Sequence, residues 1–254
     1  MRIASWNVNS LKVRLPHVEQ WLHSAQPDIV GLQELKLDDS SFPADAIEAM
    51  GYRSVWFGQK TYNGVALIAR EEASDVIKGI PGLEDPQRRA IAATYGDLRV
   101  INLYVVNGQS VGSDKYVYKL EWLSALHDWL QEELNRYPKL VVMGDFNIAP
   151  ADLDVHDPAA WADEVLCSRP EREALERILA LGLIDSFRQH RPQEQCFSWW
   201  DYRMGGFRRN LGLRIDLILL ADALASQLKD SGIDREPRRW ERPSDHAPAW
   251  VELG

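Results

Sequence analysis

Short apolar runs, separated by turns and helical patterns along the whole chain, most constrain what this sequence can fold into. Each run has four to seven residues, too few to cross a membrane, which takes about 20 apolar residues as a helix. Runs of this length predict β-strands. The expected strands are residues 2–8, 28–33, 52–58, 65–69, 100–104, 140–143, 215–220 and 247–251.

Two segments between these runs carry clear helical signals. The first ends before Pro138 and has leucines at three- and four-residue spacing: Leu120, Leu123, Leu126, Leu130 and Leu134. The second begins at Ser168, with Glu171 in capping-box spacing, and stops at Gly182. Strands mixed with helices predict the α/β class, with sheets in the middle and helices outside. Because no repeat, low-complexity tract or linker interrupts the sequence, we expect one domain over residues 1–254.

Charge and cysteine content narrow the class of protein. The net charge of −9 counts against a nucleic-acid partner, because nucleic-acid-binding domains are usually basic. A catalytic site rich in carboxylates is an exception, since a bound cation offsets its negative charge locally. Basic residues do cluster, at residues 88–89, 208–214 and 235–242. Two cysteines are too few for a disulfide framework, and the N-terminus lacks an apolar signal segment. We therefore expect a cytoplasmic protein without membrane attachment.

Polar residues stand where several of the expected strands begin or end. They are Asn7, Glu34, Tyr104, Asp145, Asn147 and Asp216. Open α/β sheets bind ligands at strand ends, where such side chains converge. The pattern therefore predicts one shared site.

These residue types suit the hydrolysis of a phosphate ester. Asp145 and Asn147 point to the same side of an extended chain, and Glu34 is a typical oxygen ligand for Mg²⁺. His246 needs a carboxylate to fix its tautomer, and Asp216 is the candidate. Each residue alone fits an ordinary structural role, such as an Asx turn or a solvated strand end. Together they supply a cation site, a base and donors for phosphate oxygens.

Five ordered segments carry a family resemblance. They are residues 6–11, 32–36, 144–147, 212–216 and 244–248, supported by residues 58–60, 62–66, 87–89 and 198–203. In this order they resemble the endonuclease/exonuclease/phosphatase superfamily, and within it the exonuclease III branch of DNA repair nucleases. The resemblance covers essentially the whole chain.

The resemblance implies a four-layer α/β sandwich with two central mixed β-sheets flanked by helices. It implies Mg²⁺ or Mn²⁺ bound by Glu34, with Asn7 and Asp245 near the metal. Of the implied catalytic residues, Asp145 orients or deprotonates the attacking water. Asn147 and His246 bind the phosphate, and Asp216 orients His246. Tyr104 contacts the phosphate or helps the leaving group. The general base stays open between Asp145 and the Asp216–His246 pair.

The resemblance also implies three activities: 3′→5′ exonuclease, 3′-end cleaning as a phosphatase or phosphodiesterase, and cleavage 5′ to abasic sites. The implied substrate is double-stranded DNA with abasic sites or with damaged or recessed 3′ ends. Trp199, Leu213 and Ile215 would line a small apolar pocket, which admits a base-less sugar and excludes a nucleotide. The implied phosphate contacts are Arg88, Arg89, Lys119 and Arg208. We expect a monomer.

Two departures from the family pattern bear on activity. Val106 stands where the family commonly has proline, so the loop after Tyr104 is less constrained. Leu166, in the unfamiliar stretch of residues 155–170, is bulky enough to obstruct an internal abasic site while sparing a frayed 3′ end. We therefore expect 3′-end processing to outweigh abasic-site incision.

Two other functions compete with this interpretation. A superfamily enzyme acting on phosphoinositides, sphingolipids or undamaged DNA would keep the metal site, but would not need residues 198–203 and 212–215. A catalytically inactive DNA-binding module would have lost at least one of four residues, all of which are present: Glu34, Asp145, Asp216 and His246.

Overall fold

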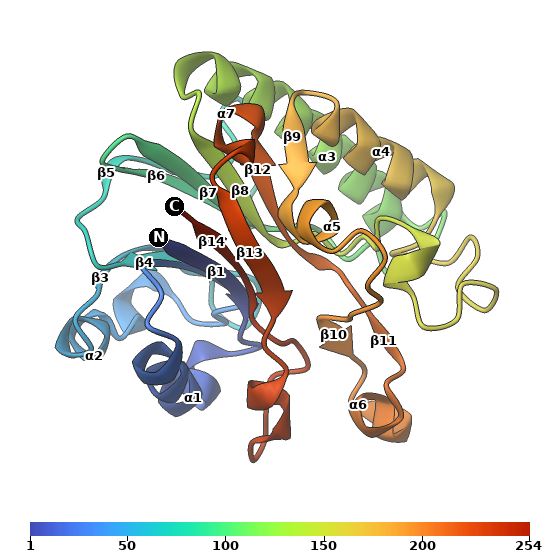
Figure 1. Cartoon of the computed structure of the whole chain (residues 1–254), viewed down its shortest axis with the longest axis horizontal. Helices are drawn as coiled ribbons and strands as arrows, with labels where there is room; N and C mark the ends of the chain where they lie inside the picture. Colours follow the sequence, from blue (N-terminus) through green and yellow to red (C-terminus); the bar gives the residue numbers. More distant parts are fainter.

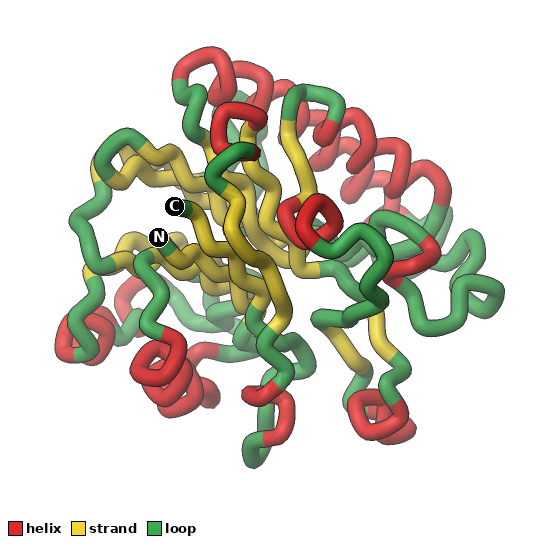
Figure 2. The backbone as a smooth tube through the Cα atoms, viewed as in Figure 1, coloured by secondary structure: helices red, strands yellow, loops and turns green.

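The computed structural model of the protein describes residues 1–254 and consists of two β-sheets packed face to face. Helices cover the outer side of each sheet, which gives four layers (Figures 1 and 2). The expected α/β sandwich is therefore confirmed. No helix combines the length and apolar character needed to cross a membrane.

The first sheet has six strands and contains both chain termini. Their order is β13 (Leu228–Ile233), β14 (Ala249–Leu253), β1 (Arg2–Asn7), β2 (Ile29–Gln33), β4 (Val65–Ala69) and β3 (Arg53–Phe57). Only β1 and β2 run parallel, and the other neighbours are antiparallel, so the sheet is mixed.

The second sheet is built in the same way around one parallel pair. Its six strands are β5 (Ser74–Lys78), β6 (Ala90–Tyr95), β7 (Leu98–Tyr104), β8 (Leu140–Asp145), β12 (Asp216–Ala221) and β9 (Leu183–Asp185). The parallel pair is β7 and β8. A separate hairpin of β10 (Trp199–Trp200) and β11 (Gly212–Leu213) extends below the sheets in Figure 1.

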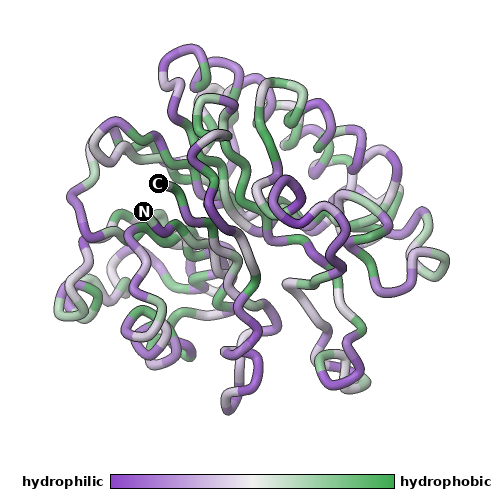
Figure 3. Tube along the Cα trace, in the orientation of Figure 1, coloured by the Kyte–Doolittle hydropathy of each residue, from purple (hydrophilic) through white to green (hydrophobic).

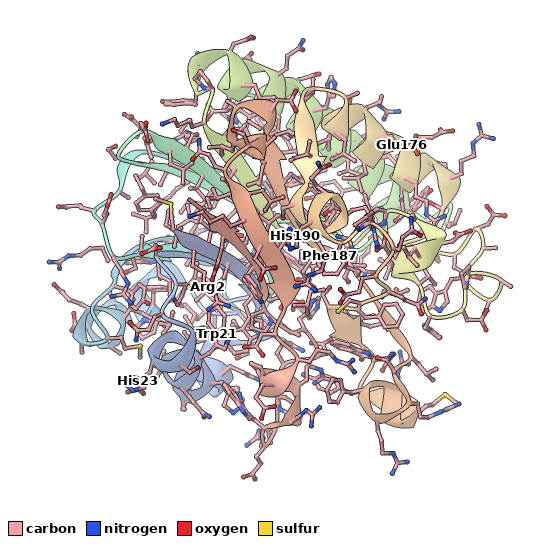
Figure 4. The ribbon with its side chains drawn as sticks, viewed as in Figure 1. Arg2, Trp21, His23, Glu176, Phe187 and His190 are labelled. Atoms are coloured by element: carbon pink, nitrogen blue, oxygen red, sulfur yellow. The ribbon has the colours of Figure 1, made fainter.

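Helices α1 (Leu11–Ala25) and α2 (Ala44–Ala49) cover the first sheet, and α3 (Asp114–Arg136) and α4 (Arg169–Leu179) cover the second. Short helices fill the connections: α5 (Ser186–His190), α6 (Gly206–Arg209) and α7 (Asp222–Ala225), with 3₁₀ turns η1 (Asp39–Ser41), η2 (Asp152–Asp154), η3 (Arg203–Gly205) and η4 (Glu236–Arg239). Each covering helix is amphipathic. Figure 4 shows Trp21 on the inner side of α1, whereas His23 and Glu176 project outward.

Three apolar clusters hold the layers together. One fills the space between the sheets, and the other two lie between each sheet and its helices. Figure 3 shows the hydrophobic residues concentrated along the central strands. Each fully buried Val, Leu, Ile or Phe contributes about 1.5–3 kcal/mol through removal of its surface from water. The sandwich therefore gives the strand ends a rigid support.

All eight predicted strands are present, but the sequence did not reveal β5, β6, β9, β13 or the two short strands of the hairpin, β10 and β11. Strand β6 is rich in alanine, β9 has three residues, and the polar β13 lies at a sheet edge. The two predicted helices are present as α3 and α4, and the capping box of Ser168 and Glu171 is formed.

Candidate active site

Strand register brings the predicted polar residues to one end of the sandwich. In the first sheet Asn7 pairs with Gln33, the residue before Glu34. In the second sheet Asp145 lies level with Tyr104 on one side and Asp216 on the other. Because the two sheets face each other, these strand ends form one site.

Asn7 links the acidic residues of the two sheets. Its Nδ2 atom donates to Glu34 Oε1 at 3.0 Å and to Asp145 Oδ2 at 2.9 Å. Glu34 also pairs with Lys36, whose Nζ lies 2.8 Å from Glu34 Oε2. The amide therefore holds two carboxylates close together that would otherwise repel each other.

His246 lies between two aspartates. Its Nδ1 is 2.9 Å from Asp216 Oδ2, and its Nε2 is 3.8 Å from Asp145 Oδ2. All three side chains are almost fully buried. A backbone bridge between Trp199 and His246 ties this segment to the projecting hairpin. The histidine that the sequence paired with Asp216 is thus brought against Asp145 as well.

This arrangement shifts the pKa values of two site residues. Burial disfavours a charged imidazole, but Asp216 and Asp145 outweigh that effect and raise the pKa of His246 to about 10. Burial raises the pKa of Asp145 to about 7; the charge on His246 opposes this shift, and Asp216 adds to it. These shifts favour a protonated His246 and make Asp145 a stronger base than an ordinary aspartate, which suits it to accept a proton.

The same residues offer a cation site. One ligand atom each from Glu34, Asp145 and His246 lies within 4.8 Å of the others. The two carboxylates suit a hard divalent cation, whereas His246 in its protonated form has no free lone pair for a metal. Asp245 lies apart from this group: its Oδ1 accepts from Asn9 at 2.9 Å and its Oδ2 from Trp199 Nε1 at 3.0 Å. Burial favours the neutral form of Asp245, but the His246 charge and these hydrogen bonds lower its pKa.

Asn147 and Tyr104 complete the inner site. The backbone N–H of Asn147 donates to Asp145 Oδ1 at 2.9 Å, and its side-chain amide donates to Val105 O at 3.0 Å. Burial, reinforced by Glu34 and Asp145, raises the pKa of Tyr104 well above its ordinary value, so the phenol stays neutral. The guanidinium of Arg89 lies 4.8 Å from the Tyr104 ring centroid.

Beside the polar site lies an apolar cluster that contains two of the predicted pocket residues. Leu213 and Ile215 are buried, and Trp199 packs against them while partly exposed. Leu166 belongs to the same cluster and is 4% exposed, so its side chain already occupies apolar space there.

The predicted phosphate contacts have different settings. Lys119 is fully buried and paired with Glu171, so its side chain offers no surface to DNA. The predicted phosphate contact of Lys119 is therefore replaced by an ion pair inside the protein. Arg89 is nearly buried and held by Gln87. Arg88 is partly exposed with one guanidinium nitrogen 2.8 Å from Asp39, and Arg208 lies exposed on α6.

Sequence reasoning missed three polar residues that support the site: Asn9, Lys36 and Asn107. Asn9 joins Lys36 to Asp245, and Asn107 Nδ2 donates to Asn147 Oδ1 at 3.1 Å. Backbone strain is the second missed feature, because Glu34 and Asn147 both have positive φ, 53° and 49°. Such strain clusters at functional sites. Side-chain type and spacing give no signal of it.

The chain is similar to known nucleases over its full length. Residues 4–246 match the Endonuclease/Exonuclease/phosphatase family. Exodeoxyribonuclease III of Haemophilus influenzae is 39% identical, with 100% of each protein aligned. Among solved structures, a 3′ phosphatase from Neisseria bound to a product DNA hairpin is 52% identical with a TM-score of 0.99, covering 100% of this chain and 99% of that one. An AP endonuclease from Archaeoglobus fulgidus is 38% identical with a TM-score of 0.96 and the same coverage.

Proposed function

The chain belongs to the Endonuclease/Exonuclease/phosphatase family, and from this membership we propose that it is a metal-dependent DNA repair nuclease that acts mainly on 3′ ends. Its reactions would be 3′→5′ exonuclease cleavage, removal of 3′-phosphates and related blocking groups, and weaker incision at abasic sites. The contact between His246, Asp216 and Asp145 beside Glu34 carries the proposal. The two unpaired cysteines support a cytoplasmic location.

Mg²⁺ or Mn²⁺ is the proposed cofactor, because the donors around Glu34 and Asp145 are mainly oxygen atoms. Asn7 keeps the carboxylates of Glu34 and Asp145 together, and Asp245, at the rim of the active site, is a further proposed oxygen ligand for the cation. When bound, the cation neutralises charge that builds up on the phosphate in the transition state.

Asp145 is the proposed base for the attacking water. Its raised pKa supports this role, and the proximity of Asn7 and Asn147 fixes its orientation. Asp216 favours the protonated form of His246, which suits it to donate a hydrogen bond to a phosphate oxygen rather than to accept a proton. Asn147 is a second donor, and the neutral phenol of Tyr104 can donate beside it.

Substrate choice follows from the apolar cluster. A flipped abasic sugar needs room beside Trp199, Leu213 and Ile215, and Leu166 fills part of that space. A phosphate at a 3′ terminus reaches the polar site without entering the cluster. DNA phosphates on either side would meet the partly exposed Arg88 and the exposed Arg208. We propose that a monomer suffices, since all of these groups come from one chain.

Two end-labelled duplexes test this function, one with an internal tetrahydrofuran abasic analogue and one with a recessed 3′-phosphate. Purified protein is assayed with Mg²⁺ and again with chelator. Chelator-sensitive release of the 3′-phosphate, with slower incision of the first duplex, is the expected result. Inactivity on both duplexes, with cleavage of an inositol or sphingolipid phosphate ester, would assign the site to a non-DNA substrate.

A further inference from the structure

A buried ion pair lies directly behind the active site, between α3 and α4. Lys119 and Glu171 both have fully buried side chains and contact each other. Lys119 Nζ also donates to the backbone oxygen of Asn147 at 2.6 Å and to that of Asn107 at 3.2 Å. The lysine therefore holds the loop that carries Asn147, the proposed phosphate donor.

The glutamate of this pair holds a second segment. Glu171 Oε1 accepts the backbone N–H of Leu166 at 3.0 Å, and its Oε2 accepts that of Ser168 at 3.1 Å. Leu166 has a φ of 76°, a conformation that non-glycine residues rarely adopt. Its carbonyl accepts the N–H of Ala149 at 2.8 Å, which links the two segments a second time.

These contacts form a closed ring that joins the loop of Asn147 to the segment of Leu166. One arm runs from Asn147 through Lys119 and Glu171 to Leu166, and the other runs through Ala149. Burial of two charges is costly, and a well-packed apolar pair is often as stable. Stability alone therefore does not account for the pair, whereas its directional contacts fix both segments.

We propose that Lys119 and Glu171 are positioning residues that couple the phosphate-binding Asn147 to Leu166, the residue that narrows the sugar pocket. This inference rests on the proposed function, because it concerns the choice between 3′ ends and internal abasic sites. When the ring is intact, Leu166 stays in the apolar cluster and internal sites are disfavoured. When the ring is broken, Leu166 moves and the pocket opens, while Asn147 is held less firmly for every substrate.

The decisive variant replaces both charges, Lys119→Met with Glu171→Met, so that neither is left buried alone. Turnover of the 3′-phosphate duplex should fall, and the ratio of abasic-analogue incision to 3′-phosphate release should rise about tenfold, within the usual range for coupling between two sites. The matched control is Arg99→Met with Glu133→Met, another buried pair, whose Nε and Oε2 atoms are 2.6 Å apart. It should leave the ratio unchanged.

A second variant, Lys119→Gln with Glu171→Gln, covers the event that the methionine pair does not fold. It removes both charges, keeps polar side chains of similar length and should raise the same ratio. A folded variant in which both activities fall in parallel, or neither changes, would overturn the proposal, since a merely structural pair lowers both together.

Amide hydrogen exchange separates this proposal from the proposed function because it needs no substrate. Ala149 contacts neither charged side chain through its N–H, yet its exchange should accelerate in both Glu171 variants and not in the control. Unchanged exchange at Ala149 would refute the coupling even if the nuclease activity is confirmed. Accelerated exchange would uphold the ring even if the wild-type protein released no 3′-phosphate.

Discussion

Replacing Leu166 with glycine should convert this protein toward an abasic-site endonuclease. Leu166 is 4% exposed and packs in one cluster with Leu213 and Ile215. Glycine removes the whole side chain from that cluster. It also suits the backbone, because a φ of 76° is unfavourable for leucine and readily adopted by glycine.

The cost in stability comes from two opposing effects. Loss of a buried leucine side chain usually destabilises a protein by about 2–5 kcal/mol. Relief of the left-handed backbone conformation returns about 1–2 kcal/mol. The net loss is therefore about 0–4 kcal/mol, with each kcal/mol lowering the Tm by about 2–4 °C in a chain of this size.

Single-turnover incision of a duplex with an internal tetrahydrofuran site measures the gain in activity. We expect incision to rise at least about tenfold, equivalent to about 1.4 kcal/mol of relieved obstruction. Release of a recessed 3′-phosphate should change little, because that substrate does not enter the cluster. The control Leu130→Ala removes buried surface under α3 and should lower the Tm without raising incision. Unchanged incision by folded Leu166→Gly protein would refute the obstruction.

Three further predictions follow from the polar site and the DNA-binding surface. Asp145→Asn should leave DNA affinity nearly intact while lowering turnover by about 10²–10⁴, as expected for loss of a general base, and near-normal single-turnover rates would exclude Asp145 from that role. Glu34→Gln should abolish the rise in Tm that Mg²⁺ gives the wild-type protein, measured by calorimetry, and an equal rise in both proteins would place the cation elsewhere. The Michaelis constant for duplex DNA should increase as NaCl is raised, because arginines such as Arg88 release counterions from the phosphates; a constant value would argue against a phosphate-tracking surface.

Much of the fold could be predicted because the central strands are apolar on both faces. Strand β8, for example, is buried along its whole length, and its last two residues are Gly144 and Asp145, which still pair with both neighbouring strands. Strand β13 could not be found in this way, since its sequence is polar and its stability comes from pairing with β14.

The inner site could be predicted because its polar residues stand out at the ends of apolar strands. A charged residue such as Asp216 at the start of an apolar strand needs a partner, and His246 is that partner. The environment of Lys119 could not be predicted, because lysines on helices are usually exposed to solvent. Its partner Glu171 also lies 52 residues away in the sequence. The positive φ of Leu166 was hidden as well, since it depends on Glu171 and Ala149 rather than on local sequence.

Competition between two substrates in one tube measures directly whether the protein prefers 3′ ends to internal abasic sites. The wild-type protein is given equal amounts of a recessed 3′-phosphate duplex and an internal abasic-analogue duplex, each with its own label, in Mg²⁺. The ratio of the two initial rates gives the ratio of kcat/KM values. We expect the 3′-phosphate duplex to be consumed at least about tenfold faster, because Leu166 obstructs only the abasic substrate. Equal consumption, or faster incision of the abasic duplex, would contradict it.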